Sequence, residues 1–79
     1  MSWMIEVYLP EPEEPSEERR VVELAQAAGG ELTFREARGN TGVARGVCLT
    51  IEFPEESSAS GAADAIRGLG LHVEGPGEY

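Results

Sequence analysis

Four residues of types that bind metals or transfer protons lie in segments where polar and apolar residues alternate. They are Glu6, Cys48, Glu52 and His72. Thiolate, imidazole and carboxylate ligands could together bind a divalent metal, and a cysteine beside a histidine could act as a nucleophile. Their spacing follows only from strand alternation, however, and nearby carboxylates would disfavour the thiolate of Cys48. We therefore predict no catalytic residue, metal site or cofactor, and rank an enzyme below a binding protein.

A second candidate site is the glycine-rich segment 38–46. Arg38 and Arg45 bracket it, with Asn40 and Thr41 between them. Two guanidinium groups and glycine-flanked amides could hold an anion. The sequence Gly-Asn-Thr-Gly is much looser than a phosphate-loop signature, and a flexible turn with two solvated arginines is the simpler interpretation. If the protein binds a small molecule or an anion, we expect these four residues to bind it.

Length and charge limit the remaining functions. The chain has 79 residues, enough for one domain over 1–79, with 15 acidic and six basic residues and a formal net charge of −9. Nucleic-acid affinity depends on dense cationic side chains, so we predict no nucleic-acid partner. The single Cys48 excludes an internal disulfide framework. A domain of this size buries only about 60% of the surface that its unfolded chain exposes, and packing alone must stabilise it. We therefore expect a small free energy of unfolding.

The amino-terminal segment is not typical of a membrane or secretory sequence. No basic residues precede its apolar stretch, which Glu6 interrupts and Pro10 ends. A membrane span needs about 20 apolar residues, and a secretory signal needs a basic start. We predict no membrane association, and a cytoplasmic location as the default.

Alternation and helical spacing predict six elements. The strands are expected at Trp3–Leu9, Leu32–Arg35, Val47–Phe53 and Leu71–Glu74. The first helix is expected from a Ser16 cap to about Ala28, where Gly29-Gly30 would end it, and the second between Pro54 and Gly68.

Three segments are predicted to connect or flank these elements. Residues 10–15 form an acidic, proline-rich loop, and 38–46 form the tip of a hairpin that makes its two strands antiparallel neighbours. Gly75-Pro76-Gly77 is expected to stop the last strand, which leaves 75–79 as a carboxyl-terminal tail.

The order strand, helix, strand, strand, helix, strand resembles the ferredoxin-like sandwich. That resemblance implies an α+β fold, βαββαβ, with a four-stranded antiparallel sheet and two helices on one face. It covers nearly the whole chain but assigns no residue a role, because many unrelated functions use this fold.

The sheet face away from the helices is the predicted functional surface. Apolar side chains on this face would be exposed to water in a single copy. Binding a second copy of the chain or another protein would bury them and so gain free energy. We therefore expect a small, acidic, non-catalytic interaction module that forms a homodimer or binds a protein partner. The expected interface residues are Met4, Glu6, Tyr8, Arg35, Cys48, Thr50, Glu52 and His72.

Overall fold

The computed structural model describes residues 2–10, 15–37 and 46–78. They form four strands and two helices in the predicted order. The elements are β1 (Trp3–Leu9), α1 (Pro15–Ala27), β2 (Glu31–Ala37), β3 (Val47–Phe53), α2 (Glu56–Arg67) and β4 (His72–Glu78). None of the helices in these ranges is long and apolar enough to cross a membrane.

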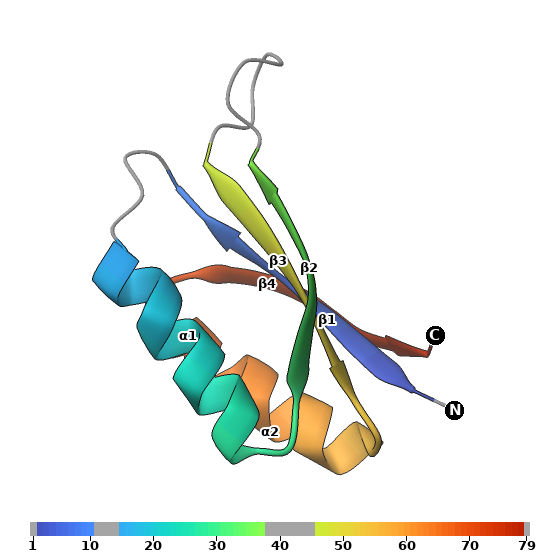
Figure 1. Cartoon of the computed structure of the whole chain (residues 1–79). Coiled ribbons are helices and arrows are strands. Elements are labelled where there is room, and N and C mark those ends of the chain that lie inside the picture. The colour runs from blue at the N-terminus through green and yellow to red at the C-terminus, as the bar shows by residue number, and fades with distance from the viewer. Residues whose placement is uncertain (1, 11–14, 38–45, 79) are drawn as a thin grey trace.

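The strands form one antiparallel sheet in the order β2-β3-β1-β4, so β2 and β4 are its edges. Both helices cover the same face of the sheet (Figure 1). This confirms the predicted α+β sandwich, and the arrangement is that of the ferredoxin-like fold. The carboxyl-terminal strand pairs with the amino-terminal one.

The hydrophobic core lies between the sheet and the helices, as strand alternation predicts. Ile5, Val7, Leu49 and Ile51 are fully buried, and Val73 is nearly so. The helices add Val21, Ala25, Ala59, Ala62, Ala63 and Ile66. The small alanines of α2 let this helix lie close to the sheet.

Helix α1 differs from the prediction at its start and agrees at its end. It begins at Pro15, so Ser16 lies in the first turn and is not its cap, and Pro15 belongs to the helix rather than to the preceding loop. Proline suits the first helical position, where no intrahelical partner exists for an N–H. At the other end, Gly29 has φ of +90°, and Gly29 and Gly30 donate hydrogen bonds to the carbonyls of Gln26 and Ala25. This is the Schellman termination that two glycines favour.

Strand β2 contains a bulge that the sequence does not reveal. Leu32 pairs with Ile51, but Phe34 pairs with the next residue, Thr50, so Thr33 is the extra residue in the ladder. An extra residue reverses which side chains point to each face beyond it. Leu32 therefore packs against the core, whereas Phe34 is 59% exposed.

Strand β4 is longer than predicted. It continues through Gly75-Pro76-Gly77 to Glu78, so the expectation of an unpaired tail from 75 is wrong for residues 75–78. Gly77 pairs with Met4 and Glu74 pairs with Glu6, with a shift of register between them. The bulge lies at Gly75-Pro76, between these two pairs, and β4 stays paired with β1 on both sides of it.

Candidate interaction surface

The sheet face away from the helices, here called the open face, carries three rows of side chains. Opposite residues in antiparallel strands share a face, so the pairing register defines each row. From β2 to β4 the rows are Glu31, Glu52, Met4 and Gly77; then Phe34, Thr50, Glu6 and Glu74; then Glu36, Cys48, Tyr8 and His72. In the described part of the chain, no helix covers this face (Figure 1).

Seven of the eight residues predicted at the interface lie together on the open face. They are Met4, Glu6, Tyr8, Cys48, Thr50, Glu52 and His72. The structure therefore places them on one surface, and their role in binding stays a prediction.

Arg35 does not belong to this surface, and its expected position is wrong. It pairs with Leu49, which faces the core, because the bulge at Thr33 shifts the alternation. Its guanidinium binds the carboxylate of Glu18 on α1, with Nε 2.9 Å from Oε2 and Nη2 3.2 Å from Oε1. The guanidinium of Arg35 therefore lies on the side of the sheet opposite the glutamates of the open face.

On β2, three residues of the open face are absent from the expected interface: Glu31, Phe34 and Glu36. Glu31 could have been found, because extending the alternation of β2 by one residue places it beside Glu52. Phe34 and Glu36 could not, because the alternation around them gives no sign of a bulge.

Tyr8 contacts its neighbours on both sides in the row that ends in His72. The rings of Tyr8 and His72 lie with centroids 5.4 Å apart and inclined at 46°. His72 Nε2 lies 3.2 Å from Glu74 Oε2, while Cys48 is buried beside Tyr8 although it lies outside the core. Burial raises the pKa of the Tyr8 phenol, as do the negative charges of Cys48, Glu6 and Glu74 and a hydrogen bond with Cys48.

Tyr8 also separates the two residues that could have formed a reactive pair. Cys48 lies on β3 and His72 on β4, with β1 between them. Neighbouring strands are about 4.8 Å apart, so the two side chains start from backbones roughly 10 Å apart. In residues 2–10, 15–37 and 46–78, no three histidine, cysteine, aspartate or glutamate side chains are grouped to hold a metal ion.

The four residues predicted to bind an anion are not placed by the structure. Arg38, Asn40, Thr41 and Arg45 lie outside the described residues. The hairpin that carries them does join β2 to β3, which are antiparallel neighbours as predicted. The anion-binding hypothesis therefore stays a prediction.

The open face is strongly acidic. It carries Glu6, Glu31, Glu36, Glu52 and Glu74. Among the described residues of the three rows, His72 is the one side chain that can carry a positive charge. Such a surface attracts cations and repels a copy of itself.

Comparisons with known proteins give a distant structural similarity. No family model and no curated protein matches the sequence. One solved structure, a protein from Burkholderia cenocepacia described as an amidohydrolase/peptidase, aligns with 92% of this chain at 14% identity and a TM-score of 0.45. This chain spans 26% of the length of that protein, and a similarity at this level carries no functional argument.

Proposed function

We propose that the protein is a non-catalytic interaction module whose open face binds a protein partner with cationic side chains. The observation that supports this best is the gathering of five glutamates around exposed or half-buried apolar groups, on a face that no helix in the described part of the chain covers. In such a surface, complementary charge determines which partner binds, and burial of the apolar side chains contributes part of the affinity.

The electrostatics favour a different protein over a second copy. Face-to-face pairing of two copies would bring five glutamates from each copy into one interface. Arg35 cannot compensate their charge, because its side chain lies on the opposite face of the sheet, where it binds Glu18. Burying like charges against one another is costly, because each loses water without gaining a counter-ion. Arginine or lysine on the partner removes that cost.

The size of the face indicates a weak or transient complex. Strands of seven residues are about 23 Å long, and four strands span about 19 Å, which gives roughly 440 Å². A stable interface buries about 800 Å² on each partner. The open face alone supplies about half of that area.

A titration with a tetra-arginine peptide tests the proposal. At low salt we expect backbone amide shifts in the four strands that form the open face, and affinity that falls as salt is added. Neutralising Glu36 and Glu52 together (Glu36→Gln, Glu52→Gln) should weaken binding about threefold to tenfold. The matched control, Glu23→Gln with Glu56→Gln on the helices, removes the same charge from other surfaces.

Two results would overturn this function. One is equal weakening by both pairs of substitutions, which would mean that net charge alone attracts the peptide. The other is a dimer in sedimentation experiments at high salt that the open-face substitutions strengthen, which would indicate self-association instead.

A further inference from the structure

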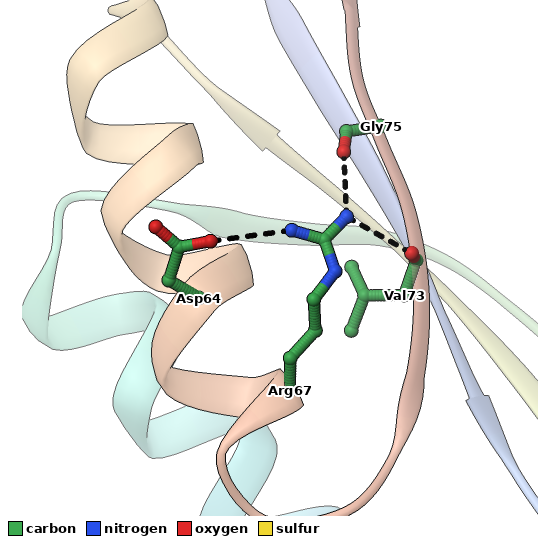
Figure 2. A network of polar contacts seen from close by, with 4 residues as sticks. All are labelled: Asp64, Arg67, Val73 and Gly75. Atoms are coloured by element: carbon green, nitrogen blue, oxygen red, sulfur yellow. Dashed lines mark hydrogen bonds and ion pairs between the residues drawn. The ribbon is translucent and has the colours of Figure 1, made fainter.

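The edge formed by β4 is closed to further strand pairing. The guanidinium of Arg67, at the end of α2, donates through Nη2 to the backbone carbonyls of Val73 at 3.1 Å and Gly75 at 2.9 Å (Figure 2). Alternate residues of a strand point their carbonyls to the same side, so one side chain occupies two successive acceptors of this edge. Pro76 lacks an N–H, and the bulge disturbs the ladder. Natural sheets use such devices to stop edge pairing.

Within residues 2–10, 15–37 and 46–78, the opposite edge, β2, lacks this cover. Six of its seven residues are exposed, and Leu32 is the half-buried exception. An edge strand presents unpaired N–H and C=O groups, and the group that matches them best is another extended backbone. Phe34, the exposed large hydrophobic residue, lies on this strand beside Thr50.

A second copy of β2 fits this edge poorly. In symmetric antiparallel pairing, a two-fold axis lies midway between one residue and its own copy, which therefore face each other. An axis at Arg35 or Glu36 opposes like charges directly. An axis at Phe34 places Arg35 opposite Thr33, where the bulge breaks the alternation. These three registers disfavour a second copy and favour a segment with a different sequence.

We propose that the β2 edge accepts an extended segment of a protein partner as a fifth strand. Cationic side chains of that segment lie beside Glu31 and Glu36, and an apolar one lies beside Phe34, because cross-strand neighbours on one face interact directly. The cationic character rests on the proposed function, whereas the strand addition rests on the edge itself. The added strand would widen the open face by about 4.8 Å.

Backbone N-methylation of a synthetic peptide tests the strand addition separately from charge. The probe is a capped octapeptide, Arg-Thr-Val-Thr-Arg-Thr-Val-Thr, whose arginines and valines share one face of the extended strand. It is compared with one version methylated at the nitrogens of residues 1, 3, 5 and 7 of the peptide and another methylated at those of residues 2, 4, 6 and 8. Both versions keep the charge, but each blocks one edge of the extended peptide. One version should bind at least about tenfold more weakly than the probe, since several backbone hydrogen bonds are lost, and the other should bind within about threefold.

Hydrogen exchange locates the binding edge on the protein. The probe should slow amide exchange in β2 and leave β4 unchanged. Glu36→Gln should weaken binding several-fold, and Glu74→Gln, on the same face at the β4 edge, should change it less than twofold.

The outcomes separate this inference from the proposed function. Equal binding by both methylated versions, with the open-face shifts retained, would overturn the fifth strand and leave the acidic face as the binding surface. Slowed exchange in β2 with equal losses from Glu36→Gln and Glu23→Gln would support strand addition and overturn the role of the open-face charges. Protection of β4 in place of β2 would overturn the choice of edge.

Discussion

The two outer strands of the sheet differ in how their backbone and side chains are covered. In β4, Arg67 binds two carbonyls (Figure 2). The ring of His72 lies against Tyr8. In β2, the ion pair of Arg35 with Glu18 ties the strand to α1, while Phe34 and most of its neighbours remain exposed. One edge of the sheet is thus covered by side chains of the chain itself, while most residues of the other edge are exposed.

The difference also has an energetic side. The β4 edge depends on an unusual backbone and on hydrogen bonds to a charged group, so it should be sensitive to single substitutions. The β2 edge is tied to α1 by the exposed ion pair of Arg35 with Glu18, so single substitutions there should change the stability less. Substitutions on each edge test that contrast.

Replacing Gly75 with alanine should disrupt the β4 edge most. Gly75 has φ of +100°, and a Cβ there would lie 2.7 Å from the carbonyl oxygen of Met4. Strain and overlap together should lower the free energy of unfolding by about 2–3 kcal/mol, measured by urea denaturation. Gly77→Ala is the matched control, since its Cβ meets nothing within 4 Å, and should cost less than about 1 kcal/mol. Equal losses in both variants would contradict this account.

Replacing Arg67 with alanine should remove the cover of β4. The substitution breaks hydrogen bonds to Val73 and Gly75 and an ion pair with Asp64 at 3.3 Å. The side chain is 43% exposed, so solvent screens these contacts and we expect a loss of only about 1 kcal/mol. Thermal unfolding measures it, with Arg20→Ala on α1 as a control for charge. Unchanged stability would show that the contacts contribute nothing in solution.

The ion pair that ties β2 to α1 should contribute less. A double-mutant cycle with Arg35→Ala and Glu18→Ala should give a coupling free energy of about 0.5 kcal/mol, since Arg35 is 45% exposed. Added salt should reduce it further. Glu17→Ala, one residue away, should show no coupling with Arg35. A coupling as large as the loss in Arg67→Ala would remove the contrast between the edges.

The smallest effect concerns the pH dependence of Tyr8. Its pKa is raised above the ordinary value of 10.0, chiefly by burial and then by the charges of Cys48, Glu6 and Glu74. The folded protein holds this proton more tightly than the unfolded chain. The resulting stability is fully present below pH 10 and is lost as pH rises through the folded pKa. Ultraviolet titration in a Tyr79→Phe background measures the pKa, which Glu74→Gln should lower toward 10.0. An increase would contradict the assigned cause.

Much of the fold could be predicted because its signals are local. The alternation in β1 and β3 identifies which residues face the core, and the two glycines after α1 mark where that helix ends. The seven open-face residues in β1, β3 and β4 follow from the same alternation once the strands pair. The predicted hairpin identifies β2 as the neighbour of β3, but it does not determine which residues of the two strands pair with each other.

The sequence by itself determined the order of elements, the core-facing positions of three strands and the acidic character of the protein. The tertiary structure alone decided that Arg35 faces Glu18, that Phe34 and Glu36 join the open face, and that β4 continues beyond Gly75. The physical reason is the same in each case. A bulge is chosen by pairing with a neighbouring strand that is distant in sequence, and one extra residue reverses every side chain after it.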